Sequence, residues 1–266
     1  MTLDRVAIIG AGRVGHSLAR ALTRCGCIVK LIGREVPDVD QSDLVLIAVP
    51  DDAIEEVAGA LARSRTVSSG QVVLHTSGLH DRMALAALGS TGAALGSWHP
   101  LQTFAAAGGD PGALAGSPAV IEGDARALEA GRWLAGRLHL RPVIEISAAA
   151  KPAYHAAAVF ASNYLVALAE IATRLGAAAG AGDAAAEMFM PLMRRTLANY
   201  SSTGAASLTG PIRRGDAGTV ALHLATLTGN DRTLYMSLGR ETLRLAREAG
   251  LEPDRASAIE RLLTAG

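Results

Sequence analysis

The sequence is short of several residue types, and each shortage excludes a class of protein. Its 266 residues include two cysteines, Cys25 and Cys27, whose spacing suits neither a disulfide framework nor a tetrahedral zinc site. Lys and Arg together number 25, as do Asp and Glu, so the chain lacks the basic excess typical of proteins that bind nucleic acid. We therefore expect a protein of the reducing cytoplasm that has no nucleic-acid partner.

The chain also lacks the patterns of membrane proteins, metalloenzymes and common hydrolases. Residues 1–12 are typical of a strand entering a turn and not of a signal peptide. The most apolar later stretch, residues 156–169, is interrupted by Ser162 and Asn163 and is too short to cross a bilayer core of about 30 Å. The seven histidines are scattered, and no HExxH, GxSxG or Walker pattern is present. We expect no membrane segment, no metal site and neither hydrolase nor kinase activity.

Strand and helix signals alternate in the first half of the chain. Short apolar runs predict strands at residues 6–9, 27–32, 43–49, 72–74, 93–96, 119–122 and 142–146. Strands that alternate with helices favour a doubly wound parallel sheet. Later in the chain the pattern is helical, over residues 151–178, 184–200, 218–228, 231–249 and 254–264. The expected fold class is α/β, with a doubly wound domain at residues 1–150 and an all-helical domain at residues 151–266.

A glycine-rich turn joins the first predicted strand to the first predicted helix. It has the pattern GxGxxG and consists of Gly10, Ala11, Gly12, Arg13, Val14 and Gly15. Glycines in this pattern permit a tight turn, let the backbone approach a pyrophosphate and allow close packing of the helix, whose N-terminus stabilises negative charge. Because the turn lies between a strand and a helix, we expect these six residues to bind a dinucleotide.

The end of the second predicted strand bears on which nucleotide is bound. Arg34 follows Gly33 there, about 20 residues after the glycine-rich turn, where an Arg pairs with a 2′-phosphate and an acidic residue accepts from the ribose hydroxyls. Arg34 therefore favours NADP(H) over NAD(H). Glu35 keeps NAD(H) open, because a shift of one residue would place its carboxylate at the ribose. Arg13 is a second candidate for contact with phosphate.

Two further turns are expected to line the cofactor crevice. Ala48, Val49 and Pro50 end the third predicted strand, and Thr76 and Ser77 follow the fourth. Ligands of doubly wound sheets bind beyond the carboxyl ends of the strands. The small side chains of both turns would leave room for a nicotinamide ribose.

Longer segments resemble known families. The glycine-rich turn, the AVPDDAI turn and the helical second half are similar to the 6-phosphogluconate dehydrogenase-like superfamily, which includes pyrroline-5-carboxylate reductases, prephenate dehydrogenases and β-hydroxyacid dehydrogenases. HTSG, GSWHPLQTF, KPAYHAAAVFASNYLVAL and LTGPIRRGD resemble, over nearly the whole chain, an uncharacterised family that joins a Rossmann-like domain to a C-terminal domain of unknown function. The resemblance implies an NAD(P)-binding Rossmann-like domain, a 6-phosphogluconate dehydrogenase-like helical domain, a homodimer formed through the C-terminal helices and an oxidoreductase activity. It does not supply a substrate.

Hydride transfer to a C=O or C=N group needs a proton donor, and the reverse reaction needs a base. His99 follows the fifth predicted strand and resembles the His-Pro turn of prephenate dehydrogenases, and Pro100 holds it in an extended or turn geometry. Gln102 offers amide donors and an acceptor to a substrate carboxylate or hydroxyl. We expect His99 and Gln102 at the active site, with a purely structural histidine as the alternative.

The first helix of the second half carries a polar stripe. In β-hydroxyacid dehydrogenases a Lys near the start of this helix protonates the substrate oxygen, with an Asn four residues on. Here Lys151 begins the helix, the Asn position holds His155, and the nearest Asn is Asn163. A proline directly after Lys151 suits the first helical position and would leave Lys151 at the cap. Lys151, His155, Ser162 and Asn163 are expected to contact the site, whereas Tyr154 is expected to pack.

A loop between two later helices holds a pair of arginines. Arg213 and Arg214 have the fork geometry that binds an anionic substrate, although paired loop arginines are often solvated. Asp216 is expected to cap the helix that follows.

These features favour an NADP(H)-dependent oxidoreductase that acts on a small oxo or imino acid, or on its hydroxy or amino counterpart. Lys151 or His155 would handle the proton, and His99 with Gln102 would orient the substrate. The alternative is a protein that senses NADP(H) without turnover, which needs the glycine-rich turn and the dimer but not His99, Lys151 or His155. A non-redox ligand of the same fold is a third possibility.

Overall fold

The computed structural model describes residues 3–34, 37–104 and 114–265. The chain divides into two compact units, Met1–Asn163 and Tyr164–Gly266. The first unit contains the sheet together with helix α4 (Lys151–Ala161). The boundary predicted near residue 150 thus lies at the start of α4, whereas the division between the two units lies just after its end.

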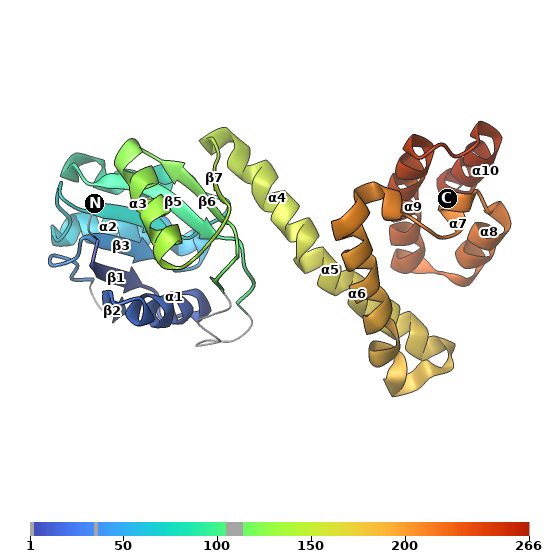
Figure 1. Cartoon of the computed structure of the whole chain (residues 1–266), viewed down its shortest axis with the longest axis horizontal. Helices are drawn as coiled ribbons and strands as arrows, with labels where there is room; N and C mark the ends of the chain where they lie inside the picture. Colours follow the sequence, from blue (N-terminus) through green and yellow to red (C-terminus); the bar gives the residue numbers. More distant parts are fainter. Residues whose placement is uncertain (1–2, 35–36, 105–113, 266) are drawn as a thin grey trace. The chain divides into compact units, whose positions relative to one another are not determined.

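A seven-stranded sheet with the order β2-β1-β3-β4-β5-β6-β7 forms the centre of the first unit (Figure 1). Its strands are β1 (Arg5–Ile9), β2 (Ile28–Ile32), β3 (Leu44–Ile47), β4 (Val72–His75), β5 (Ala94–Pro100), β6 (Ala119–Gly123) and β7 (Val143–Glu145). All seven are at positions that the apolar runs predict. Adjacent strands are parallel except for β5 and β6, which pair in opposite directions.

Helices cover both faces of this sheet, which confirms the doubly wound architecture. On one face α1 (Arg13–Arg24) and α3 (Ala125–Arg137) bury Leu18 and Leu134 against Leu46 and Leu74. On the other face α2 (Ile54–Ser64) and the 3₁₀ helix η2 (Arg82–Thr91) pack on the remaining strand residues. The central strands β3 and β4 are buried along their whole length, because helices cover them on both sides.

Strand β5 is longer than the sequence predicts. The apolar run ends at Gly96, yet the strand continues through Pro100, because the antiparallel partner β6 supplies backbone partners beyond the end of β4. His99 therefore lies within β5, opposite Val120, in the extended one of the two geometries predicted for it, and not after the strand. Pro100 lies beyond the last pair of β5 with β4, so the strand is an edge there, and proline is tolerated on edge strands.

The second unit is helical. Its helices are α5 (Asn163–Gly176), which begins at the last residue of the first unit, α6 (Ala185–Thr203), α7 (Pro211–Arg214), α8 (Ala217–Thr226), α9 (Gly229–Glu248) and α10 (Pro253–Thr264). Val220, Leu243 and Ile259 belong to the core that α7 to α10 share. Asp216 caps α8 as predicted, since its Oδ1 accepts from the backbone N–H of Thr219 at 3.0 Å.

The helix predicted over residues 151–178 is not continuous. Ser162, with φ −127° and ψ −69°, separates α4 from α5. Farther on, Gly180 has a φ of +108°, a conformation that glycine adopts readily because it has no side chain. After this turn, α6 packs beside α5. A Cβ on Gly176 would lie 2.4 Å from the Phe189 ring, so a glycine is needed where the two helices meet.

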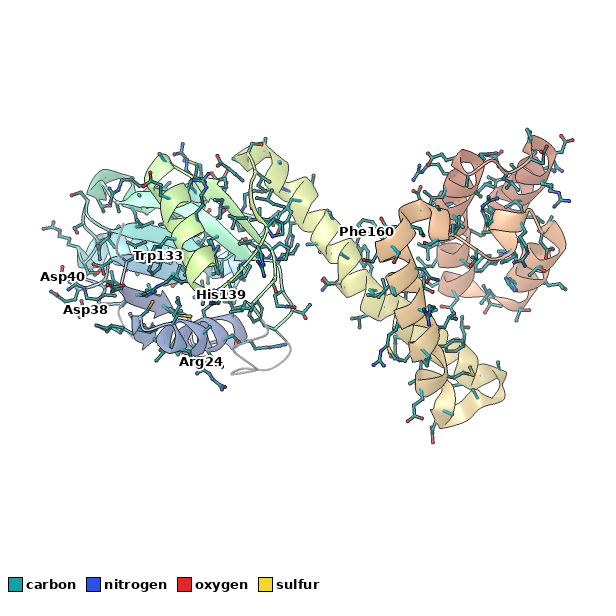
Figure 2. All side chains as sticks on the ribbon, viewed as in Figure 1. Arg24, Asp38, Asp40, Trp133, His139 and Phe160 are labelled. Carbon is teal, nitrogen blue, oxygen red and sulfur yellow. The ribbon has the colours of Figure 1, made fainter. Side chains whose placement is uncertain are left out.

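Large apolar side chains stay exposed on α4, α5 and α6. Phe160 is 68% exposed (Figure 2), Val166 is 70% exposed and Leu192 is 63% exposed. The helical run Ala148–Arg214 contains an 18-residue window of mean hydropathy 1.5, which by length and composition is apolar enough to cross a membrane. That run is longer than the apolar stretch singled out in the sequence, but breaks at Ser162 and Gly180 prevent it from being one straight helix.

Candidate active site

The glycine-rich turn forms a cradle at the carboxyl end of β1. Gly10 has a φ of +112°, and a Cβ on it would lie 2.3 Å from the Ala48 carbonyl oxygen. A Cβ on Gly15 would lie 1.9 Å from the Gly10 oxygen, whereas one on Gly12 would meet no described atom within 4 Å. Gly12 is also the N-cap of α1, with no side chain capping this helix end. The N-terminus of α1 is thus open and uncapped, and its glycines let a ligand approach the backbone closely. These are the features that bind the pyrophosphate of a dinucleotide.

Arg34 and Arg13, two of the residues predicted to choose the nucleotide, lie at the same sheet edge. Arg34 is exposed two residues after β2 ends, and Glu35 falls outside the described residues. Arg13 begins α1, and its Nη1 donates to the Phe104 carbonyl oxygen at 3.5 Å. This contact links the glycine-rich turn to the segment that follows β5.

The two predicted turns also lie at the carboxyl edge. The Ala48 N–H donates to the Ile9 oxygen at 2.7 Å, and the Thr76 N–H donates to the Ile47 oxygen at 3.0 Å, so each turn continues the sheet ladder by one residue. The Ser77 hydroxyl accepts from two backbone N–H groups of its own turn, those of Leu79 and His80. Its side chain therefore shapes the turn. Val49 is partly buried and Pro50 exposed, directly before η1 (Asp51–Ala53).

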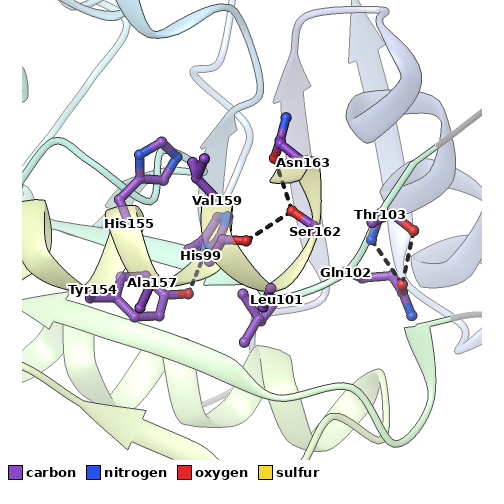
Figure 3. A pocket seen from close by; sticks show the side chains of 12 residues that line it. His99, Leu101, Gln102, Thr103, Tyr154, His155, Ala157, Val159, Ser162 and Asn163 are labelled. Atoms are coloured by element: carbon purple, nitrogen blue, oxygen red, sulfur yellow. Dashed lines mark hydrogen bonds between the residues drawn. The ribbon is translucent and has the colours of Figure 1, made fainter. Parts of the chain in front are cut away.

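A pocket of about 590 Å³ opens beside the end of β5 (Figure 3). It is lined by His99, Leu101, Gln102, Thr103, Tyr154, His155, Ala157, Ala158, Val159, Ala161, Ser162 and Asn163. These residues come from two segments, the end of β5 with the loop after it, and α4 with the first residue of α5. Five of the predicted site residues thus meet in one cavity, namely His99, Gln102, His155, Ser162 and Asn163.

His99 and Tyr154 form a hydrogen-bonded pair in this pocket. The Tyr154 Oη lies 2.6 Å from the His99 Nδ1, and the rings meet edge to face with their centroids 5.7 Å apart. Burial lowers the pKa of His99 to about 4, and the charges of Lys151 and His155 act in the same direction. Burial raises the pKa of Tyr154 to about 12. At neutral pH the pair therefore consists of a neutral imidazole and a protonated phenol.

At Gly78, the turn after β4 packs closely against the imidazole rings of His99 and His155. A Cβ there would lie 2.9 Å from the His155 Cδ2 and 3.1 Å from the His99 Cε1. Only a residue without a side chain lets these rings approach the turn so closely.

Lys151 does not line the pocket, contrary to the expectation of a lysine left accessible at the helix cap. None of its surface is exposed. Its Nζ donates to the Ser97 Oγ at 2.7 Å and to the Ser77 carbonyl oxygen at 3.2 Å. Burial lowers the pKa of Lys151 to about 8, although the nearby carboxylates of Glu122, Asp81 and Asp51 act against this shift.

The remaining predicted substrate ligands have partners within the chain. The Gln102 amide donates to the Ser117 Oγ at 2.9 Å, and its oxygen accepts from the Thr103 N–H at 2.8 Å. The Ser162 hydroxyl lies 2.8 Å from the Ala158 oxygen and 2.9 Å from the Asn163 Oδ1. These side chains shape the wall of the pocket and present polar atoms along it.

Arg213 and Arg214 belong to the second unit. The Arg213 Nη2 donates to the Ala249 carbonyl oxygen at 3.0 Å, at the C-terminal end of α9. Both arginines line a separate depression with Arg255. Their assignment to an anionic substrate stays a prediction.

Tyr154 lines the candidate site, although the sequence predicts that it packs. It follows Lys151 by three residues, and residues three apart share a helix face. This spacing was a usable signal, but the aromatic ring alone indicates packing as strongly as chemistry. The partner on β5 appears only in the folded chain.

Comparisons with known proteins agree with this architecture. A Rossmann-like domain model matches residues 32–100, and the model of a domain of unknown function, DUF2520, matches residues 117–242. A Bacteroides fragilis protein provisionally assigned as an NADP oxidoreductase has a similar structure, with a TM-score of 0.72 at 20% identity over 90% of this chain and 97% of its own. A Thermotoga maritima protein gives a TM-score of 0.70 at 24% identity over 92% of this chain and 99% of its own.

The likeness extends to a protein of known activity. The Plasmodium falciparum pyrroline carboxylate reductase, solved with NADP bound, gives a TM-score of 0.61 at 11% identity and covers 99% of this chain and 100% of its own. At these identities the likeness shows a shared fold. A comparison with curated proteins finds no match. The chain joins a Rossmann-like domain to a DUF2520 domain, the pairing that its sequence motifs predict.

Proposed function

We propose that this protein is an NADP(H)-dependent oxidoreductase that transfers hydride between the nicotinamide and a small oxo or imino acid, or its hydroxy or amino counterpart. One observation carries the proposal: the Tyr154–His99 pair lies in a pocket at the sheet edge that also carries the glycine cradle. In doubly wound sheets this edge is where ligands bind. The NADP-linked names of two proteins that share the fold support the same class of reaction.

The pair fits the proton transfer that accompanies reduction. Bound NADPH would supply the hydride. In the tautomer that carries the proton on Nδ1, the neutral His99 would donate to the Tyr154 oxygen, which would leave the phenol hydrogen for the substrate oxygen or nitrogen. As that atom gains negative charge it takes the proton of Tyr154, and the phenolate is stabilised by His99 until a proton from water restores it. In the oxidative direction the steps run in reverse: Tyr154 first releases its proton to water, and the phenolate that forms accepts the substrate proton.

The pocket wall suits a small substrate with one polar end. Leu101, Ala157 and Val159 offer apolar contact to a carbon skeleton. The side-chain amide of Asn163 offers neutral N–H donors to a carboxylate, whereas the Ser162 hydroxyl already donates within the chain. His155, packed on Gly78 beside His99, is the second candidate for handling the proton.

The first test is fluorescence titration of the purified protein with NADPH and with NADH, repeated on Arg34→Ala. We expect tighter binding of NADPH and a selective loss in the variant, because Arg34 would pair with the 2′-phosphate. Equal affinity for the two nucleotides in both proteins would contradict the NADP preference. Failure to bind either nucleotide would contradict the oxidoreductase as a whole.

A second test separates an enzyme from a sensor. Oxo and imino acids are screened for oxidation of NADPH, with Tyr154→Phe and His99→Gln measured beside the parent protein. We expect turnover that both variants lose while NADPH affinity is kept. Tight NADPH binding with no turnover on any substrate would favour the sensor and contradict the enzyme.

We also propose that the protein is a cytoplasmic homodimer formed through its exposed apolar helices. Val166 and Leu192, both in the second unit, are more than half exposed, and large exposed apolar side chains are typical of interaction surfaces. The same two helices, α5 and α6, also carry charged residues such as Arg174 and Arg194, so a second copy with polar groups of its own is a better partner for them than lipid. Light scattering should give twice the monomer mass and Leu192→Arg should give the monomer mass. A monomeric parent protein would contradict the proposal.

A further inference from the structure

The chain contains two lysines, Lys30 and Lys151, and their surroundings differ. Lys30 is exposed on β2 and donates to the Asp38 carboxylate at 3.2 Å. Lys151 has no exposed surface. An ammonium group is costly to bury, and an apolar side chain of similar volume commonly stabilises a protein equally well. A buried lysine in this position therefore calls for a reason other than stability.

The ammonium group of Lys151 connects three segments of the first unit. Lys151 is the first residue of α4, Ser77 follows β4, and Ser97 lies within β5. The hydroxyl of Ser97 and the carbonyl oxygen of Ser77 are both acceptors of its Nζ–H groups. Glu122, buried on β6, compensates part of the charge and is itself held by the Arg82 backbone N–H at 2.8 Å.

The same three segments carry the site. Tyr154 and His155 follow Lys151 by three and four residues, so all three side chains lie on one face of α4. Gly78 is next to Ser77 in the turn, and His99 lies two residues after Ser97, on the same side of β5. Each anchor of the lysine is thus a near neighbour of a residue that contacts the Tyr154–His99 pair or belongs to it.

We propose that Lys151 is a positioning residue, whose buried ammonium group fixes the first turn of α4 to β5 and to the turn after β4, and thereby holds the Tyr154 hydroxyl on the His99 imidazole. This inference rests on the proposed function for its catalytic meaning, but its geometry is independent of any substrate. Lys151 itself touches neither the pocket nor the proton that is transferred, unlike the accessible lysine that the family resemblance implies.

The test compares the parent protein with Lys151→Met, which keeps an unbranched side chain, one atom shorter, and removes its donors. Both are labelled with ¹⁵N in the histidine rings and with ¹³C in the tyrosines, of which the chain has seven and four. In the parent, His99 should show a hydrogen-bonded Nδ1 with a contact to Tyr154. In Lys151→Met we expect this signature to be lost while the thermal midpoint stays within a few degrees.

Kinetics provide the second readout. A displacement of the Tyr154 hydroxyl by about 1 Å lowers kcat about 10²-fold, and KM should change far less, because the pocket wall formed by the later turns of α4 stays in place. Lys30→Met is the matched control and should change neither the signature nor kcat. Ser97→Ala removes one anchor but keeps the charge, and should give a smaller loss of both, which keeps the inference testable if Lys151→Met does not fold.

Two outcomes would overturn the inference. An unchanged His99–Tyr154 signature in Lys151→Met would do so, whether or not kcat falls. If both Lys151→Met and Ser97→Ala lose their structure in general, the role of Lys151 is to stabilise the fold and not to position Tyr154. The charges of Lys151, His155 and Asp51 act on the His99 ring, so the spectra of all variants are compared at one pH. Because the spectra need no cofactor or substrate, they decide the role of Lys151 even if NADPH does not bind.

Discussion

The hydroxyl oxygen of Tyr154 lies 2.6 Å from Nδ1 of His99, although 55 residues separate the two along the chain. A strand and a helix each contribute one member of the pair, and the rings meet at 78°, so the contact joins edge to face without stacking. Burial keeps the imidazole neutral and the phenol protonated, since it disfavours the charged form of each. A polar pair that is uncharged at rest and able to take up charge during reaction is what reduction of a C=O or C=N group requires.

Removing the phenol hydroxyl should remove most of the proposed activity. We expect Tyr154→Phe to lower kcat by about 10²- to 10⁴-fold, the range of general acid catalysis, with an unchanged dissociation constant for NADPH. Steady-state kinetics and fluorescence titration measure the two quantities. Tyr200→Phe is the matched control, because Tyr200 is 62% exposed on α6, and it should behave as the parent protein. Full activity of Tyr154→Phe would show that another group donates the proton, and His155 would be the next candidate.

Adding a methyl group to Gly78 should disturb the site more than the fold. The new Cβ would lie 2.9 Å from the His155 ring and 3.1 Å from the His99 ring, so at least one imidazole must move. We expect Gly78→Ala to destabilise the first unit by about 1–3 kcal/mol, as overpacking does, and to lower kcat about 10²-fold. Gly70→Ala is the control, since no described atom lies within 4 Å of its Cβ. Equal kcat values for the two variants would show that the rings tolerate displacement.

The strands of the sheet could be predicted because each produces a pattern in its own short segment of sequence. A strand covered by helices on both faces must be apolar throughout, so β3 and β4 appear in the sequence as continuous apolar runs. The end of β5 could not be predicted in the same way. Its last residues are held by β6, and the antiparallel pairing of His99 with Val120 leaves no local pattern.

The candidate site was predicted in part. Helical spacing correctly indicates that Lys151 and His155 share a face of α4, but it does not say what that face meets. Lys151 meets Ser77 and Ser97 in the interior, whereas Tyr154, expected to pack, meets His99 in the pocket. The depth of each side chain depends on contacts with distant strands, and these determine which polar group stays accessible.

Two glycines of the cradle should respond differently to the same substitution. In Gly15→Ala the Cβ would lie 1.9 Å from the Gly10 oxygen, so the turn must rearrange and the thermal midpoint should fall. In Gly12→Ala the Cβ points into open space, so the fold should keep its stability while NADPH affinity falls, because the methyl group occupies the place of a phosphate. Circular dichroism melting and NADPH titration measure the two effects. Undiminished NADPH affinity in Gly12→Ala would place the nucleotide elsewhere.

The last prediction concerns acid, and it follows from His75. This buried side chain accepts from the Ser77 N–H at Nδ1 and donates from Nε2 to the Asp81 oxygen, an arrangement that requires the neutral ring. Burial is the main cause that lowers its pKa from 6.5 to about 4. The unfolded chain therefore binds this proton first as the pH falls. The stabilisation is complete above pH 6.5 and is lost between pH 6.5 and about 4.

His75 should contribute about 3 kcal/mol to this loss, with His99 acting in the same direction. The two tryptophans, Trp98 and Trp133, both lie in the first unit, so their fluorescence during urea unfolding reports on that unit alone. In His75→Gln the free energy of unfolding should be lower near neutral pH, because the ring contacts are lost, but it should fall less steeply on acidification. Parallel curves for parent and variant would mean that His75 is protonated equally easily in both states, and that the neutral ring is not what holds the turn after β4.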